Sequence, residues 1–502
     1  MYRDKVFIWS LLLVAAFVLM GIFDPELLDH VSTVLHGAII AHFGWGYMLA
    51  AFFFLVFCIV LAFSRYGRIK LGKDEDRPEY TYFGWFSMLF AAGMGIGLIF
   101  WGVAEPLSHY MQPPEHLEKK SGASATFAMR YSFFHWGFHP WAVYIIMSLS
   151  IAYFSFRRGM PPLISSCFYP LLGEHIYGPA GKLINILAVF ATIFGIATSL
   201  GLGALQINSG LEHVYGLPAT DMNTLLIILA TTILFMISAS VGLDKGIQTL
   251  SKSNIFLAFL LLMFMLIFGP TSYILNVFTD TMGGYLNNIL EMSLAVNPFL
   301  GHEWYMDWTI FYWAWWIAWS PFVGIFVARI SRGRTIREFI GGALLVPTLL
   351  TFIWFSVFGG ASLYLELEAG AEVGHAVLED VSTGLFAVFD HYPGSVILAN
   401  AAIILLVVFF VTSADSATFV LGIMTSGGSM HPALGKKIIW GITQSSVAAI
   451  LLVSGGLVAL QQMAITAALP FTFVLLLMCY TLWRGLASEA SENTGNRFSR
   501  LS

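Results

Sequence analysis

The stretch Trp313-Ala-Trp-Trp-Ile-Ala-Trp-Ser-Pro-Phe322 carries four indole rings and a proline inside an apolar run that is long enough to cross a membrane. Residues three and four apart lie on the same face of a helix. One face therefore carries an aromatic stripe, which consists of Tyr312, Trp315, Trp316, Trp319 and Phe322. Trp313 lies to the side of this stripe.

Pro321 interferes with the helix because it has no N–H for the carbonyl of Ile317, and because its ring disfavours helical geometry at Ser320. A carbonyl without a hydrogen-bond donor is costly in hydrocarbon, unless it is buried in protein or faces a polar cavity. We therefore expect a broken helix at mid-membrane, where the indoles suggest a cavity for a cation. The alternative is a belt of interfacial tryptophans, but these rings lie well inside their span.

The composition indicates a polytopic membrane protein. Of 502 residues, 58% are hydrophobic and 11% are charged, and the mean hydropathy is +0.79; these values exclude a soluble protein with a single core. Three cysteines, Cys58, Cys167 and Cys479, give neither a disulfide framework nor a metal-binding spacing. The N-terminal apolar run lacks a small-residue cleavage site, so we interpret it as a retained first span.

Apolar windows of about twenty residues predict about twelve transmembrane helices. They lie near 6–23, 43–64, 83–107, 126–156, 182–207, 221–241, 253–275, 305–329, 337–361, 393–424, 437–455 and 457–483. If both termini are cytoplasmic, all but three of the 24 basic residues face the cytoplasm, and only Lys119, Lys120 and Arg130 lie outside. Such a distribution supports this topology in a cell membrane.

The remaining segments are connections and a tail. Two outside segments, 277–300 and 363–392, have apolar residues at helical spacing, and we expect them to lie along the membrane surface or to cap the mouth of the protein. Residues 1–483 form a single transmembrane domain. The short polar cytoplasmic tail, 484–502, is expected to be disordered.

The spans from the third to the twelfth form two groups of five that enter the membrane from opposite sides. The groups correspond to inverted repeats at about 83–275 and 305–483, and each opens with an interrupted helix, at Gly93-Met-Gly-Ile-Gly97 and at Ser320-Pro321. Paired breaks of this kind indicate the binding site of a secondary transporter. Close helix packing is the alternative for the glycines, because Gly93 and Gly97 also form a small-xxx-small contact.

A second aromatic group lies in His135-Trp-Gly-Phe-His-Pro-Trp-Ala-Val-Tyr144 and offers Trp136, Trp141 and Tyr144. A quaternary ammonium has no N–H donor, so aromatic faces attract it instead, by about 0.5–2 kcal/mol per contact. His135 and His139 could bind a metal, but structural hydrogen bonding is favoured. Glu105 and Asp415 are carboxylates at or near membrane depth, for which a structural role and a transport role are equally supported.

These motifs resemble the betaine/choline/carnitine transporter family along essentially the whole chain. The resemblance rests on the three motifs quoted above, at 93–97, 135–141 and 313–322, on Phe100-Trp-Gly-Val-Ala-Glu-Pro106, on Ala328-Arg-Ile-Ser-Arg-Gly-Arg334 and on Thr412-Ser-Ala-Asp-Ser416. It implies an all-α fold with a five-plus-five inverted-repeat core of the amino-acid symporter type. It also implies two extra N-terminal helices, a homotrimer and alternating access.

The resemblance also implies binding residues. The methylated ammonium of the substrate would lie among Trp315, Trp316 and Trp319, and its carboxylate near the backbone from Ala92 to Met94 and near Ser199. Trp136, Trp141 and Tyr144 would line the route or form a second aromatic box. Sodium would bind the carbonyls of Ala91, Met94 and Phe409 and the hydroxyls of Thr412 and Ser413. A second sodium site would use Thr192 and Phe322, although Ile196 replaces a hydroxyl of the family pattern.

The same resemblance favours sodium coupling. Proton-coupled choline carriers tend to have Asp where this chain has Gly97, and exchangers of the carnitine type place a cationic side chain where spans five and eight have none. We therefore expect a symporter that imports glycine betaine or a similar methylated zwitterion as an osmoprotectant, with no cofactor and no nucleic-acid partner. The alternatives are a choline, carnitine, ectoine or sulfonium carrier, sodium- or proton-coupled, and a channel or sensor. An intramembrane enzyme lacks a recognisable constellation.

Overall fold

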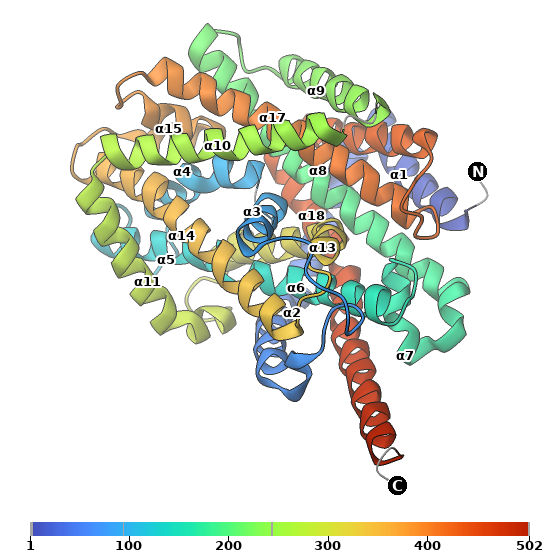
Figure 1. The fold of residues 1–502 in the computed structure, drawn as a ribbon. Helices are drawn as coiled ribbons and strands as arrows, with labels where there is room; N and C mark the ends of the chain where they lie inside the picture. Colours follow the sequence, from blue (N-terminus) through green and yellow to red (C-terminus); the bar gives the residue numbers. More distant parts are fainter. Residues whose placement is uncertain (1–3, 94, 242–243, 500–502) are drawn as a thin grey trace.

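The computed structural model of the chain describes residues 4–93, 95–241 and 244–499, and within these ranges every regular element is helical. This confirms the predicted all-α class. Figure 1 shows α13, Phe311–Ile330, near the centre of the helix bundle, with α3, α6 and α18 around it. The central position of α13 follows from its composition, because it is apolar on every side and can be accommodated only in the interior.

The longer helices follow one another along the chain with short connections. They are α1 Lys5–Phe23, α2 Pro25–Phe63, α3 Tyr82–Gly93, α4 Ile96–Met111, α5 Gly122–Trp136, α6 Phe138–Ala152, α8 Pro179–Tyr215, α9 Asp221–Val241, α10 Asp244–Phe268, α11 Thr271–Leu294, α13 Phe311–Ile330, α14 Ile336–Leu367, α17 Ser395–Met424 and α18 Leu434–Ser499. Among the shorter ones, a π-helical turn Tyr153–Arg157 extends α6, and α15 Val373–Glu379 and α16 Gly384–Phe389 precede α17.

Nine helical segments of the described ranges are long and apolar enough to cross a membrane, or ten if the bent pair α10 and α11 is counted as one span. The segment in α18 is 58 residues long, about 87 Å at 1.5 Å per residue, nearly three times the thickness of the hydrocarbon core. Non-helical backbone angles at Gly455 and Gly456 divide it into two spans. The broken pair α3 and α4 supplies a further span, so the model is consistent with the twelve that we expect.

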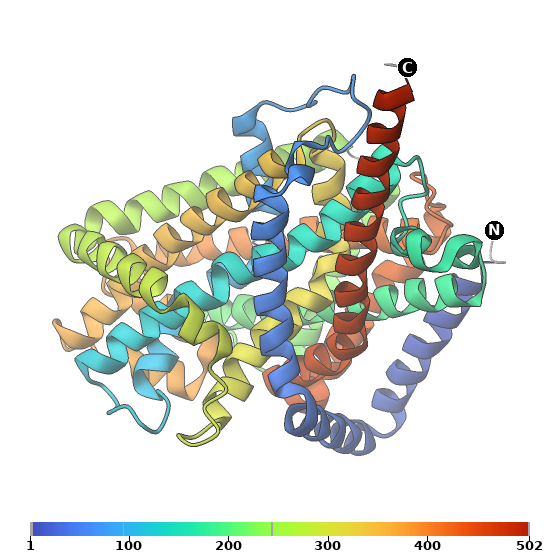
Figure 2. The same ribbon diagram turned by 90° about the horizontal axis from the view of Figure 1, so that it is seen from below.

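The two outside segments are helical. Helix α11 bends away from α10 by 108°, and α15 and α16 pack against the C-terminal end of α4, where Gly374 lies against Met111 and Gly384 against Val103. Helix α1 and the first part of α2 run along the outside of the bundle (Figure 2) and carry many exposed apolar side chains. Such a surface is typical of contact with lipid.

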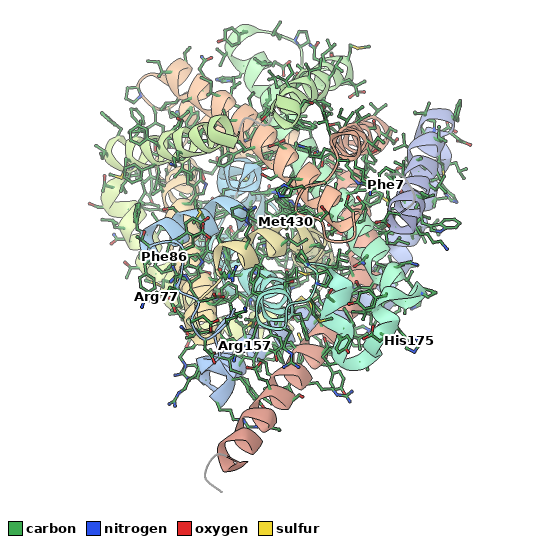
Figure 3. The ribbon with its side chains drawn as sticks, turned by 45° about the vertical axis from the view of Figure 1, so that its right-hand side comes forward. Phe7, Arg77, Phe86, Arg157, His175 and Met430 are labelled. Atoms are coloured by element: carbon green, nitrogen blue, oxygen red, sulfur yellow. The ribbon has the colours of Figure 1, made fainter. Side chains whose placement is uncertain are left out.

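The tail is not disordered as expected, because α18 continues to Ser499. Its end projects beyond the bundle in Figure 1 and lies beside α2 in Figure 2. Glu489 anchors it by an ion pair with Arg157 and by accepting a hydrogen bond of 2.9 Å from the hydroxyl of Tyr153. Arg157 lies near the point where this part of α18 leaves the bundle (Figure 3). These partners are more than 330 residues away in sequence, so local composition could not indicate them.

Candidate functional site

The glycine motif interrupts a membrane helix, as predicted. Helix α3 ends at Gly93 and α4 begins at Ile96, with Gly95 in a backbone geometry that is neither helical nor extended (φ −146°, ψ −122°). Met94 lies outside the described residues, as do the side chains of Ala91 and Ala92. The unwinding leaves backbone N–H and carbonyl groups between the two half-helices without the partners that a continuous helix would provide.

The glycines also permit close packing, so both interpretations of the motif hold. A Cβ at Gly93 would lie 2.4 Å from the Trp141 ring, and a Cβ at Gly97 would lie 2.7 Å from Trp136 and 2.8 Å from Trp315. No Cβ contact is tolerated at such distances without movement of the rings. Gly97 therefore allows two indoles to approach the same point of the backbone from opposite sides.

A second interruption, at Gly137, was not predicted. It separates α5 from α6 and leaves carbonyls at the end of α5 without helical partners. Two side chains donate to them: the indole N–H of Trp316 to the oxygen of His135, and the hydroxyl of Thr351 to the oxygen of Trp136, both at 3.0 Å. The signal in the sequence was Gly137 followed by Pro140, because proline is tolerated in the first turn of a new helix.

The predicted break at Ser320-Pro321 is wrong. Helix α13 runs without interruption from Phe311 to Ile330, with Pro321 inside it. The hydroxyl of Ser320 donates a hydrogen bond of 2.8 Å to the oxygen of Ile317, the carbonyl that Pro321 cannot serve. A side-chain donor thus replaces the missing backbone donor, and the helix continues.

A cavity lies between the broken α3–α4 pair and the intact α13, and α5, α8 and α17 complete its wall. Its empty volume, which includes space open to solvent, is about 250 Å³. Its lining consists of Gly93, Gly95, Ile96, Gly97, Trp136, Ser199, Trp315, Trp316, Trp319 and Ser413. The structure therefore brings together six of the predicted site residues and the three glycines of the motif, from segments that are up to 320 positions apart.

Indole rings form the largest part of this lining, and they face the interior rather than lipid. Trp315 and Trp316 stack with centroids 4.6 Å apart, and Trp136 meets Trp316 edge-on at 4.9 Å. Trp319, on the next turn, is 5% exposed, and its indole N–H has no hydrogen-bond partner among the described residues. Trp313 points elsewhere, toward the sulfur of Met48 at 3.2 Å. A belt of interfacial tryptophans is excluded for these rings.

The other two residues of the second aromatic group contact the lining from outside. The Tyr144 ring lies 6.2 Å from both Trp316 and Trp319, and the Trp141 ring lies 5.6 Å from Tyr144. The hydroxyl of Tyr144 and the indole N–H of Trp141 have no partner within the described part of the chain. Trp136 alone of the three predicted residues lines the cavity.

The hydroxyl oxygen of Ser413, one of the residues predicted to bind sodium, lies beside the unwound segment. A Cβ at Gly95 would be 3.8 Å from the hydroxyl oxygen of Ser413 and 3.7 Å from the Phe409 ring, so the break faces α17. The hydroxyl of Thr412 donates to the oxygens of Val408 (2.9 Å) and Phe409 (3.3 Å). Its proton is therefore directed toward the backbone and its lone pairs are free to bind a cation, as hydroxyls and broken-helix carbonyls do in transporters.

The residues predicted for a second sodium site are buried and contact other parts of the protein. Thr192 on α8 is buried and donates to the oxygen of Ala188 at 2.7 Å, and Phe322 on α13 is 6% exposed. Ile196 is buried on the next turn of α8. Ser199 lies one turn further, lines the cavity and is 3.4 Å from the oxygen of Gly195.

Arg334, the last residue of the basic motif, is 2% exposed and lies 4.0 Å above the ring of Trp85, at the start of α3. It donates to the oxygen of Tyr80 at 2.8 Å and pairs with Glu338. Trp85 in turn donates to Ser331 at 2.9 Å. The segment after α13 thus holds the beginning of the helix that breaks at the cavity.

Glu105 and two histidines form a buried cluster behind the cavity. Sequence reasoning identified Glu105 and His135 separately, and the structure adds His109. His139 is not part of this cluster, because its Nε2 atom pairs with the hydroxyl of Ser293 at 2.9 Å. The hydrogen bonding expected for His135 and His139 is therefore present.

Comparisons with known proteins identify the family of the chain. The model of the betaine/carnitine/choline family transporters matches residues 5–491. The chain is 51% identical to the glycine betaine transporter OpuD of Bacillus subtilis, over 97% of this chain and 95% of the relative. It is 44% identical to an ectoine/hydroxyectoine transporter of Virgibacillus pantothenticus, over 97% of each chain, and 42% identical to glycine betaine transporter 1 of Vibrio parahaemolyticus, over 96% and 92%.

The family match covers nearly the whole chain, including both half-helices of the α3–α4 break and every residue of the aromatic lining. An all-helical bundle with many apolar spans is what a multi-pass membrane transporter requires. The chain belongs to the betaine/carnitine/choline transporter family.

Proposed function

We propose that this protein imports glycine betaine, or a similar methylated zwitterion, by symport with sodium. The observation that carries the proposal is the cavity in which Trp136, Trp315, Trp316 and Trp319 face the unwound segment at Gly95. A trimethylammonium group offers no N–H, so aromatic faces are its natural partners. Four indoles around a small cavity supply several such contacts.

The other end of a zwitterion needs hydrogen-bond donors. The indole N–H of Trp319 lacks a partner among the described residues, and the break between Gly93 and Ile96 leaves backbone N–H groups beside the same cavity. A carboxylate accepts such donors readily, because half-helix N-termini favour anions. The cavity therefore suits a ligand with a methylated cation at one end and a carboxylate at the other.

Sodium coupling is supported by the oxygens near Gly95. The hydroxyls of Thr412 and Ser413 and the carbonyl of Phe409 are hard ligands, and Ser413 also lines the cavity. A cation held there would be adjacent to the substrate and to the broken helix. Gly97 favours sodium over protons for a second reason, because an acidic side chain at this position would collide with Trp136 and Trp315.

The ectoine/hydroxyectoine transporter among the relatives makes ectoine the second candidate substrate. Ectoine is also a zwitterion with a delocalised cation, so the same cavity could bind it. Choline lacks a carboxylate and would leave the donors unpaired. By resemblance, we further propose a homotrimer in the cell membrane with cytoplasmic termini and a role in osmoprotection.

Uptake into proteoliposomes tests the proposal. Labelled glycine betaine, ectoine and choline are compared under an inward sodium gradient, an inward proton gradient, and neither. We expect concentrative uptake of glycine betaine that requires sodium and collapses when a sodium ionophore is added. Equal uptake without sodium would refute the coupling, and concentrative uptake of choline alone would refute the substrate. Electrical conductance without accumulation would indicate a channel.

A further inference from the structure

Glu105 lies fully buried on α4, between α5 and α13, where its two oxygens accept hydrogen bonds in pairs. Oε1 accepts from Nδ1 of His135 at 2.7 Å and lies 3.3 Å from Nε2 of His109. Oε2 accepts from the indole N–H of Trp136 at 2.7 Å and from the hydroxyl of Tyr312 at 2.5 Å. Four donors, three of them on other helices, therefore converge on one carboxylate.

Stability alone is a poor explanation for this arrangement. Taking a carboxylate out of water is costly, and well-packed apolar residues of similar volume often serve a protein interior as well or better. What the carboxylate does provide is direction, because each donor must point at one of two oxygens. It therefore fixes the orientation of the Trp136 and Tyr312 rings.

Both rings held by Oε2 contact the same indole of the cavity. Trp136 lines the cavity and meets Trp316 edge-on at 4.9 Å. The Tyr312 ring lies nearly parallel to Trp316, with centroids 6.0 Å apart. A shift of either ring would displace Trp316.

His135 supplies a third connection to Trp316. Its Nδ1 is fixed by Glu105 and its Nε2 pairs with the hydroxyl of Thr309 at 2.9 Å, while its ring stacks on Tyr312 at 4.6 Å. The backbone oxygen of the same residue accepts the indole N–H of Trp316 at 3.0 Å. The cluster therefore reaches the cavity at two indoles, Trp136 directly and Trp316 through His135.

The carboxylate also changes the charge of the rings. An indole N–H or a phenol O–H that donates to an anion becomes more polarised, which makes the ring face more negative. The attraction of an aromatic face for a cation grows with that negative charge, and it is stronger in a site from which water is excluded. Glu105 thus acts on a bound cation through Trp136, which lines the cavity.

A metal site is the other interpretation of Glu105, His109 and His135, whose ligand atoms lie within 4.8 Å of one another. Ligands at the usual ~2.0–2.2 Å from zinc would be about 3 Å or more apart. The 2.7 Å between Glu105 and His135 is shorter and matches a hydrogen bond. The second oxygen of Glu105 accepts hydrogen bonds from Trp136 and Tyr312. Hydrogen bonding therefore explains the cluster better than metal binding does.

We propose that Glu105 is a positioning residue of the binding cavity: it orients the Trp136 and Tyr312 rings against Trp316 and strengthens the attraction of the Trp136 ring for the cationic end of the substrate. The second half of this inference rests on the proposed function, whereas the first concerns ring geometry alone. Neither half depends on which ion is coupled.

The test compares Glu105→Gln, Tyr312→Phe and the double variant, using the full-length purified protein and glycine betaine as the probe. Glutamine has about the same shape, but its amide nitrogen is a donor, so one pair of donors loses its acceptor. We expect each single variant to weaken binding about tenfold, the change associated with loss of one charge-assisted hydrogen bond. Because both act through the same contact, the double variant should be little weaker than either single one.

Glu489→Gln is the matched control. Glu489 is also a buried carboxylate that accepts from a tyrosine hydroxyl, and it lies on α18 in contact with Tyr153 and Arg157. Its replacement should leave the affinity for glycine betaine unchanged. The proposal would be overturned if the loss of affinity in the double variant equalled the product of the losses in the two single variants. Unchanged affinity in Glu105→Gln would also overturn it. So would a changed ion dependence with unchanged affinity, which would assign Glu105 to coupling.

A spectroscopic readout separates this inference from the proposed function. The ultraviolet resonance Raman signal of the Trp136 indole N–H is obtained as the difference between the wild type and Trp136→Phe. It should indicate a strong hydrogen bond that weakens in Glu105→Gln but not in Glu489→Gln. If the wild type binds no betaine yet this signal behaves as expected, the function is wrong and the positioning is right. An unperturbed signal in Glu105→Gln refutes the positioning, and Tyr312→Phe provides the binding test if Glu105→Gln does not fold.

Discussion

The hydroxyl of Ser320 lies 2.8 Å from the carbonyl oxygen of Ile317 and donates to it the hydrogen bond that Pro321 cannot. Through this contact α13 stays helical across a proline at membrane depth, and it carries Trp315, Trp316 and Trp319 toward one cavity. The unwound backbone of the site thus belongs to the α3–α4 break, while three of the four indoles lie on a continuous helix. A rigid aromatic wall opposite an unwound segment is the arrangement on which the binding argument depends.

The first prediction concerns this contact. Ser320→Ala should lower the free energy of unfolding by about 1–3 kcal/mol, because the buried Ile317 oxygen loses its donor. Pro321→Ala restores a backbone N–H for that oxygen, so the double variant should regain most of the lost stability. Thermal unfolding in detergent checks both variants. If Pro321→Ala fails to rescue Ser320→Ala, the serine hydroxyl does not act as the substitute donor.

The second prediction tests the space at Gly97. Gly97→Ala should weaken glycine betaine binding by roughly tenfold, because overpacking of about 1–3 kcal/mol must be relieved by movement of Trp136 or Trp315. Gly46→Ala is the matched control, since a Cβ at Gly46 on α2 would meet nothing within 4 Å. Equilibrium binding measurements on both variants decide the matter, and equal affinities would show that the two indoles are not held against Gly97.

The third prediction separates binding indoles from packing indoles on the same helix. Trp319→Leu should abolish detectable binding, because Trp319 lines the cavity, and Trp316→Leu should do the same. Trp313→Leu also removes an indole from α13, but that ring points toward Met48. It should reduce stability while the folded fraction keeps its affinity. Loss of affinity in Trp313→Leu equal to that in Trp319→Leu would contradict the assignment.

The fourth prediction concerns pH and the connection between α2 and α3. Two hydrogen bonds lower the pKa of Asp76 below its usual value. The larger effect comes from the side chain of Arg332 (3.1 Å) and the smaller from the backbone N–H of Lys73 (3.0 Å). The ion pair therefore contributes its full stability above the unfolded-state pKa of about 3.9, and this contribution is lost as pH falls through the lower folded-state pKa.

Asp76→Asn should accordingly lower the free energy of unfolding at pH 7 by about 0.2–1 kcal/mol, the range for an exposed ion pair. The difference between variant and wild type should shrink below about pH 4 as Asp76 becomes protonated. Thermal unfolding midpoints of both proteins from pH 7 downward provide the measurement. A difference that is the same at every pH would mean that the charge of Asp76 is not responsible.

Local sequence patterns predicted the parts of the structure that depend on local chemistry. Three glycines within five residues weaken a helix enough for the break at Gly93 to be foreseen, and the helical period placed Trp313 away from the other indoles. The interruption at Gly137 was missed because a single glycine in an apolar run is usually tolerated. Pro321 was misread because one neighbouring hydroxyl was enough to replace the missing donor.

The remainder depends on contacts between distant segments. Glu105 was recognised as a carboxylate at membrane depth, but its partners His135, Trp136 and Tyr312 are 30, 31 and 207 positions away. Nothing in the surrounding residues indicates that these donors converge. The tail was expected to be disordered for the same reason, since the residues that anchor Glu489 are on another span.

The central claim is that indole faces hold a methylated cation, and a neutral copy of that cation tests it most directly. Binding of glycine betaine is compared with binding of 3,3-dimethylbutanoate, which has the same shape and carboxylate but carbon in place of the charged nitrogen. Each cation–aromatic contact contributes about 0.5–2 kcal/mol, and the cavity offers several of them. We therefore expect the affinity for glycine betaine to be at least roughly tenfold higher than the affinity for 3,3-dimethylbutanoate. Equal affinity for the two compounds would show that the cavity recognises shape alone and would contradict the account.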